Sequence, residues 1–159
     1  MQDNKLKWFQ YRILHRILGT NSLLNKIKIA ENPMCRLCGL KIETIKHLFV
    51  ECPLSKALWK NVDDWVQFSV SIQLNLTPPI ILLGYIDPHI DAIPLNAILI
   101  AVKYYIFCNA KSRKQLNIFS CQNFIKKIYH EQESLSHSIG QNVKFKNKWA
   151  KISPMLLND

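Results

Sequence analysis

The sequence is poor in glycine and lacks a long apolar run. Only 4 of its 159 residues are glycine and 48% are hydrophobic, which favours a buried core over global disorder. The longest apolar stretch, residues 97–108, has about a dozen residues and contains Lys103, so it is too short to cross a bilayer and predicts a buried helix. No secretory signal is recognised after Met1. We expect one domain, or a small module on a larger body, without a membrane partner.

The 5 cysteines are odd in number and lack the spacing of a disulfide framework. Together with the absence of a recognisable secretory signal, this favours a reducing intracellular compartment, the cytoplasm or the nucleus. In such a compartment, paired cysteines bind metal more often than they form disulfides.

Basic residues are missing from the middle of the chain. Residues 61–102 contain no Lys or Arg and 4 acidic residues, whereas residues 1–60 carry 11 basic against 4 acidic residues and residues 103–159 carry 10 against 3. The net charge of +10 is therefore concentrated in two basic lobes. A basic surface is usually a solvated face, but this segregation favours a polyanionic partner, nucleic acid before membrane.

Helical periodicity runs through most of the chain. Gly19 supplies a stop for the first helix, Thr20 or Asn21 a cap for the second, and Pro53 suits a first turn. The predicted helices cover residues 6–18, 21–29, 44–52, 53–66, 91–111 and 120–139. Residues 69–83 are predicted to form a loop with an extended piece.

These elements predict a mainly α fold with a small Cys-Cys-His-Cys zinc knuckle between helices. The expected division is a zinc-binding domain over residues 1–66, an apolar linker over residues 67–94 and a helical C-terminal extension over residues 95–159.

Three cysteines and a histidine cluster within eighteen residues. The two-residue gap between Cys35 and Cys38 lets one tight turn direct both sulfurs at a single point, and Gly39 supplies backbone freedom for that turn. His47 and Cys52 are five apart, about 140° around an ideal helix, so they converge only if the helix ends near Cys52. Three thiolates and one imidazole saturate a tetrahedral Zn²⁺ and leave no position for a catalytic water. The pattern predicts one structural zinc ion.

The alternative is that these cysteines are ordinary buried thiols and that His47 is a core histidine. We favour that interpretation for Cys108 and Cys121, which lie on apolar helix faces far from any partner motif. For the four-residue set the complete spacing favours zinc.

The first predicted helix has two faces. The apolar face is formed by Leu6, Phe9, Ile13 and Ile17. The opposite face holds Trp8, Tyr11, Arg12 and His15, which suits single-stranded nucleic acid because bases stack on aromatic rings beside cations. Further candidate phosphate contacts around the knuckle are Arg16, Lys26, Lys28, Arg36, Lys41 and Lys46. The alternative is that Trp8 and Tyr11 pack against the last helices; Trp59, Trp65 and Trp149 are expected in the core.

Residues 8–60 resemble the zinc-binding domain that follows the polymerase in reverse transcriptases of LINE-type non-LTR retrotransposons. The similar features are a basic-aromatic helix ending in "HRIL", then "TN", Cys-x2-Cys-Gly, Glu43 before Thr44, "HLFVEC" and Trp59. The rest, with "ILLG" and "LNAILIAVKYYIFCNAK", resembles the C-terminal extension of the same proteins more weakly. The resemblance implies binding of template RNA, with target DNA as a second candidate, and catalysis in a separate upstream domain.

No nucleophile–base pair or open metal site is recognised, and Asp63-Asp64 falls on a predicted helix, so we expect no enzyme activity. The favoured function is a zinc-stabilised RNA-binding module. The alternative is a zinc-nucleated scaffold that docks onto a protein, first of all a reverse transcriptase core, through the apolar residues 68–83.

Overall fold

The computed structural model describes residues 2–86 and 92–157, and helices dominate this part of the chain. In chain order they are α1 (Gln2–Leu14), α2 (Asn21–Lys26), the π-helix η1 (His47–Glu51), α3 (Pro53–Val70), α4 (Pro78–Leu83), α5 (Ala92–Lys111), α6 (Ile118–Ser138), α7 (Asn142–Trp149) and α8 (Ser153–Leu157). Within the described ranges, extended backbone pairs only at an isolated antiparallel bridge between Met34 and Ile42. The predicted mainly α fold, with a Cys-Cys-His-Cys group between helices, is confirmed.

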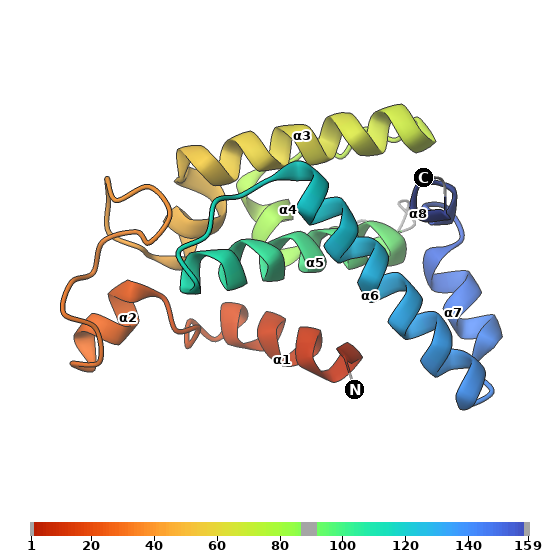
Figure 1. The fold of residues 1–159 in the computed structure, drawn as a ribbon, viewed down its shortest axis with the longest axis horizontal. Helices are drawn as coiled ribbons and strands as arrows, with labels where there is room; N and C mark the ends of the chain where they lie inside the picture. The colour runs from red at the N-terminus through yellow and green to blue at the C-terminus, as the bar shows by residue number, and fades with distance from the viewer. Residues whose placement is uncertain (1, 87–91, 158–159) are drawn as a thin grey trace.

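Figure 1 shows α5 running through the middle of the molecule, with α1 along one side and α3 along the other. The green-to-blue helix α6 packs on α5, and α7 and α8 pack on α6. α2 and the loop that carries the first two cysteines lie at the opposite end from α7 and α8. One hydrophobic cluster contains residues from all three predicted segments of the chain.

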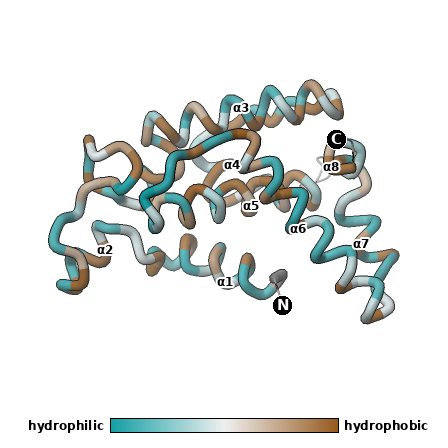
Figure 2. Tube along the Cα trace, viewed as in Figure 1, coloured by the Kyte–Doolittle hydropathy of each residue, from teal (hydrophilic) through white to brown (hydrophobic). Residues whose placement is uncertain are grey.

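Helix α5 is the centre of this cluster. It is apolar along most of its length (Figure 2), and side chains on every face of it are buried, which is the pattern of a core helix. With 20 residues it is longer than the predicted apolar stretch, and by length and composition it could cross a membrane. Half of its most apolar window is buried inside the fold, however, and core helices meet the same criterion.

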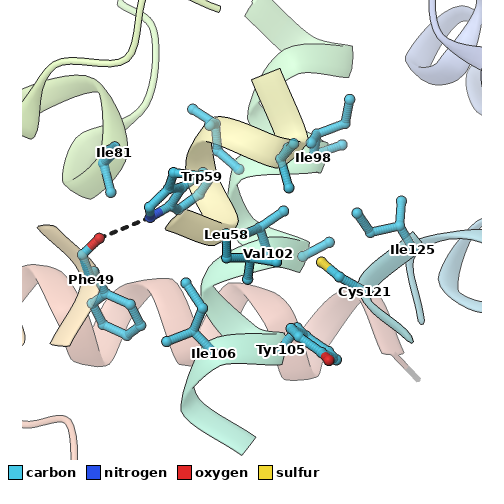
Figure 3. Packing of buried hydrophobic residues seen from close by; sticks show 14 of the residues in the cluster. Phe49, Leu58, Trp59, Ile81, Ile98, Val102, Tyr105, Ile106, Cys121 and Ile125 are labelled. Carbon is cyan, nitrogen blue, oxygen red and sulfur yellow. Dashed lines mark hydrogen bonds between the residues drawn. The ribbon is translucent and has the colours of Figure 1, made fainter. Parts of the chain in front are cut away.

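The tryptophans expected in the core lie there. Trp59 on α3 is 3% exposed and donates from Nε1 to the Phe49 carbonyl at 2.8 Å, as Figure 3 shows. This bond satisfies a buried carbonyl in the middle of η1. Trp149 is 1% exposed, and Trp65 is half-buried against the cluster.

Several predicted boundaries are wrong for local reasons. The "IILL" stretch is helical rather than extended, because Pro78 and Pro79 start α4 in its first turn. Ile17, expected on the buried face, is 53% exposed because α1 ends at Leu14, and Leu18 is buried instead. Helices α7 and α8 were not predicted.

N-terminal caps were predicted at Ser120 for the last helix and at Asp91 for the helix before it. The cap expected at Ser120 is Asn117, whose side chain accepts from the Ser120 N–H at 3.0 Å. The cap expected at Asp91 lies outside the described residues.

The "ILLG" stretch meets the start of α5 at Gly84. The Asn96 side chain accepts from the Tyr85 N–H at 2.8 Å and donates to the Tyr85 carbonyl at 3.1 Å. A Cβ at position 84 would lie 2.6 Å from Asn96 Oδ1, and φ at Gly84 is +91°. Glycine is therefore required here both for close approach and for backbone conformation.

Lys103 is buried in the middle of α5 with 2% of its surface exposed. Its Nζ donates to Gln10 Oε1 at 2.6 Å and to the Leu82 carbonyl at 3.1 Å, and Gln10 Nε2 donates to the same carbonyl at 2.9 Å. These bonds connect α5 to α1 and α4. In the described residues no carboxylate forms an ion pair with Lys103, and burial lowers the pKa of Lys103 to about 7.

Lys103→Met is expected to remove a pH dependence of stability. The folded-state pKa of about 7 lies below the ordinary value of 10.5, so the unfolded chain binds more protons between these pH values. The unfolding free energy of the wild type should therefore rise with pH, by at most about 1.4 kcal/mol per pH unit. Urea unfolding at pH 7, 8 and 9 measures this slope.

The matched control is Lys111→Met, because Lys111 is exposed at the end of the same helix. It should keep the wild-type slope, whereas Lys103→Met should flatten it. Equal slopes in the wild type and Lys103→Met would contradict the lowered pKa of Lys103 in the folded chain.

Candidate metal centre

The first two cysteines lie in a tight turn closed by backbone hydrogen bonds. The Cys35 N–H donates to the Lys41 carbonyl at 2.8 Å, and the Gly39 N–H donates to the Cys35 carbonyl at 2.8 Å. Gly39 has φ of +67° with nothing within 4 Å of a Cβ built there, so the requirement for glycine is conformational rather than steric. The Leu40 N–H faces Cys38 Sγ at 3.5 Å. The turn thus directs its sulfurs as the spacing predicted.

The other two ligands bracket the π-helix η1. The Cys52 N–H donates to the His47 carbonyl at 2.7 Å, a bond that spans five residues instead of the four of an α-helix. One wide turn therefore brings residues 47 and 52 to the same side, which resolves the 140° mismatch of an ideal α-helix. Thr44 Oγ1 accepts from the His47 N–H at 3.0 Å, so Thr44 starts this segment as predicted.

Cys35, Cys38, His47 and Cys52 converge, with all candidate ligand atoms within 4.8 Å of one another. Cys35, His47 and Cys52 are buried, and Cys38 is half-buried. A tetrahedral zinc with Zn–S bonds of about 2.3 Å places its sulfurs about 3.8 Å apart, which this cluster accommodates.

The His47 ring supports a metal at this point. Nε2 lies 3.3 Å from Cys38 Sγ, and Nδ1 is buried without a hydrogen-bond partner in the described residues. A buried imidazole with so few partners is costly unless one nitrogen binds a metal. The four side chains fit one structural zinc ion, and together they fill its tetrahedral coordination shell.

Cys35 and Cys52 influence each other's pKa. Hydrogen bonding from Cys35 lowers the pKa of Cys52 to about 5, and backbone N–H groups of Ser55 and Leu54 at the start of α3 add to this effect. The same bond to Cys52, together with burial, raises the pKa of Cys35. Of this pair, Cys52 is therefore the one closer to the thiolate form that zinc binds, and metal binding must displace the proton of Cys35.

A buried carboxylate holds the knuckle against α2. Glu43 is fully buried and accepts from the Asn21 N–H at 2.9 Å and from the Arg36 N–H at 2.7 Å. The Arg36 guanidinium also donates to this carboxylate, at 3.0 Å from Nε, and reaches the Gly19 carbonyl at 3.2 Å. Thr20, the predicted cap of α2, makes no side-chain cap bond, so Glu43 supplies the cap from a distant part of the chain.

Arg36 was expected to contact nucleic acid, but in the fold its charge is already paired with a buried carboxylate. Its side chain is 8% exposed, its charge is paired with Glu43, and its guanidinium lies 5.9 Å from the centre of the Phe107 ring. Sequence reasoning noticed Glu43 only as part of a family pattern. Its isolation as an acid among basic neighbours was the signal that it pairs with one of them.

The other predicted nucleic-acid contacts lie at or near the surface. Trp8 is 63% exposed and Tyr11 is 44% exposed, so neither packs against the last helices. Arg12 is half-buried; the exposed residues are His15, Arg16, Lys26, Lys28, Lys41 and Lys46. Lys46 forms an ion pair with Glu51 at 2.7 Å, which reduces the charge it offers to a ligand.

Cys38→Ser and His47→Ala are each expected to abolish zinc binding and to reduce helicity, because the knuckle has little core of its own and metal binding supplies folding energy. Native mass spectrometry measures the metal content, and circular dichroism measures the helicity. The controls are Cys108→Ser and Cys121→Ser, which should leave one zinc per chain. Zinc retained in both ligand variants, or lost in the controls, would show that the ligands are wrongly assigned.

Glu43→Gln is expected to lower the unfolding free energy of the zinc-loaded chain by about 3–5 kcal/mol, because it leaves the Arg36 charge buried and unpaired. Lys46→Ala breaks an exposed pair and should cost at most about 1 kcal/mol. Urea unfolding of both variants makes the comparison. Similar small losses in the two would mean that the Glu43 pair does not hold the knuckle.

The comparisons with known proteins agree with this geometry. Residues 2–59 match a protein-family model described as zinc-binding in reverse transcriptase. The matched range contains the four ligands, the Arg36–Glu43 pair and Trp59, and it covers most of the resemblance found in the sequence. No curated protein matches the chain. Residues 2–59 are thus similar to the zinc-binding domain of reverse transcriptases, and they contain a Cys-Cys-His-Cys group that fits one zinc ion.

Proposed function

We propose that the chain is a non-catalytic nucleic-acid-binding module from the C-terminal region of a LINE-type non-LTR reverse transcriptase. In this proposal it acts in a reducing intracellular compartment, without membrane contact, and its first ligand is template RNA. Target DNA is the second candidate. The zinc ion is structural and maintains the position of the α1 face that binds the strand.

The observation that carries the proposal is a row of rings along the exposed face of α1. The Trp8 and Tyr11 ring centres are 5.3 Å apart at an interplanar angle of 78°. The Tyr11 and His15 ring centres are 4.0 Å apart at 37°. Large aromatic rings are usually buried, so a row left in solvent suits base stacking.

Cations accompany this row. Arg12 lies on the same helix between Tyr11 and His15 in sequence, and Arg16 is exposed just beyond the end of α1. Rings flanked by guanidinium groups are the chemistry with which proteins bind single strands, through stacked bases and neutralised phosphates.

The absence of an enzyme activity is part of the proposal. The three thiolates and one imidazole would close a tetrahedral zinc to water. Asp63, the first of the paired aspartates, accepts from the Leu74 N–H at 2.8 Å and so has a structural role in holding the loop after α3.

A second candidate function is docking onto a reverse transcriptase core through residues 68–83. The observation that favours it is Phe68 on α3, which is 93% exposed. A groove of about 500 Å³ lined by Ile72, Leu74, Ile80 and Leu83 lies in the same part of the chain. This function needs no contact from α1.

Trp8→Ala is expected to weaken binding of a single-stranded RNA by about 1–3 kcal/mol with little change in salt dependence, because one base can no longer stack. Arg12→Ala and Arg16→Ala should weaken binding and reduce the slope of log affinity against log salt, by about 0.7 for each phosphate that is no longer neutralised. Filter binding at several salt concentrations measures affinity and slope, and thermal unfolding verifies the fold.

The matched control is Phe68→Ala, an exposed aromatic residue on a different helix, which should bind RNA like the wild type. If docking is the function, a pull-down with a reverse transcriptase core should show the opposite result. Phe68→Ala should then reduce capture of the core, and Trp8→Ala should leave it unchanged. A wild-type chain with no salt-sensitive affinity for RNA or DNA would favour the docking function over nucleic-acid binding.

A further inference from the structure

A second surface of the module is a groove of about 620 Å³ between the end of α1, α2, the segment before η1, and α4. Its apolar lining consists of Ile13, Leu14, Leu23, Ile45, Leu82 and Leu83. Leu14 is 52% exposed and Leu83 is 54% exposed, so the lining is accessible to a ligand. Single exposed apolar residues are common, but several gathered in one concavity mark a binding surface.

The edge of the groove is basic. Arg16, Lys26 and Lys46 belong to its lining, and none of the acidic residues that the structure describes does. Glu51 pairs with Lys46 from outside the lining, which leaves Arg16 and Lys26 as the cations that face a ligand most directly. The groove therefore combines an aliphatic floor with a positively charged edge.

These features discriminate between two polyanionic ligands. A nucleic-acid base stacks on aromatic rings, and within residues 2–86 and 92–157 no aromatic side chain lines this groove. The rings of Trp8 and Tyr11 belong to the exposed face of α1 and do not contribute to the lining. Aliphatic side chains instead accept the apolar face of an amphipathic helix, as in helix-in-groove recognition.

We propose that this groove binds an acidic amphipathic helix of a protein partner. Leu, Ile or Met side chains of the partner lie on the floor, and Asp or Glu side chains beside them face Arg16 and Lys26. The proposal is distinct from nucleic-acid binding, because the apolar side chains of the groove are not those of the row of rings. Arg16 is assigned to both surfaces, so the two ligands can compete for this one cation while their apolar and aromatic contacts remain separate.

The zinc ion and the groove are connected through one short segment. Thr44, Ile45 and Lys46 line the groove and directly precede the ligand His47. Thr44 also accepts from the His47 N–H, so the groove wall and the metal centre share backbone geometry. Removal of zinc should therefore abolish peptide binding as well as the knuckle fold.

The probe is a fluorescein-labelled helical peptide of about four turns, with Leu at positions one helical turn apart and Glu beside them. Two control peptides of the same length, the twins, serve as references: one has Lys in place of Glu, and the other has Ser in place of Leu. The zinc-loaded full chain should bind the Leu/Glu peptide saturably and about tenfold more tightly than either twin, measured by fluorescence anisotropy.

Leu14→Ser and Lys26→Glu should each weaken binding of the Leu/Glu peptide about fivefold or more, since both side chains line the groove. The matched controls are Leu40→Ser and Lys28→Glu. Leu40 is 71% exposed and Lys28 is exposed, and neither belongs to the groove lining. Both controls should bind like the wild type, and all four variants should retain zinc.

Amide chemical shifts distinguish the two ligands. The Leu/Glu peptide should shift residues of the groove, whereas single-stranded oligouridylate should shift residues around Trp8 and Tyr11. The proposal is overturned if the Leu/Glu peptide does not bind saturably, binds no better than the Lys twin, or binds the groove variants unchanged. It is also overturned if oligouridylate shifts the amides of the apolar groove residues Leu14 and Leu23 as the peptide does. Failure of oligouridylate to bind anywhere contradicts only the nucleic-acid function.

Discussion

The N-terminal part of the fold depends on the convergence of Cys35, Cys38, His47 and Cys52 on one point. Two short segments meet there, a backbone-closed turn and a π-helix. The π-helix packs into the core through Leu48 and Phe49, whereas the turn has little buried apolar surface to hold it against the π-helix, since Leu40 and Ile42 are exposed. A dication bound by three thiolates and an imidazole supplies the attraction that the missing core would otherwise provide. The burial of His47 with so few protein partners is favourable only with a metal at this point. The position of α2, and with it one wall of the apolar groove, follows from this convergence.

The metal centre is not isolated from the rest of the molecule. Phe49 on η1 contacts Phe9 on α1 edge-to-face, with ring centres 6.2 Å apart. The Ser55 hydroxyl donates to the Leu48 carbonyl at 2.6 Å, so α3 satisfies two backbone carbonyls of η1, one through Ser55 and one through Trp59. On the other side of the site, the Arg36 guanidinium lies over Phe107 on α5. A change at the metal can therefore reach α1, α3 and α5 through direct contacts.

The ligand set and the mainly α fold could be predicted because both are expressed in short-range spacing. Cys35 and Cys38 need only a local turn, and the apolar composition of α5 predicts that this helix is buried. The shared face of Trp8 and Tyr11 was also predictable, since it follows from helical periodicity, but their exposure was not, because exposure depends on which helices pack against α1. The cap that Glu43 supplies to α2 was overlooked because it spans 22 residues and leaves no local pattern. Arg36 was misjudged because the only local signal of its pairing with Glu43 is one acid among several basic neighbours. The π-helix could not be foreseen either, because sequence periodicity does not distinguish a five-residue step from a four-residue one over a single turn.

The extra residue in this turn has a consequence for how insertions and deletions would act. Zinc sites accept three to five residues between a pair of ligands, so the metal alone would tolerate a chain shortened by one residue between His47 and Cys52. Such a deletion would turn η1 into an ordinary α-helical turn and rotate Leu48 and Phe49 relative to α3. Their carbonyls would then point away from Ser55 and Trp59, leaving buried polar groups unpaired. The length of this segment is therefore set by the core that surrounds the site, and a shortened chain could still bind zinc while losing the packing that connects it to the helices.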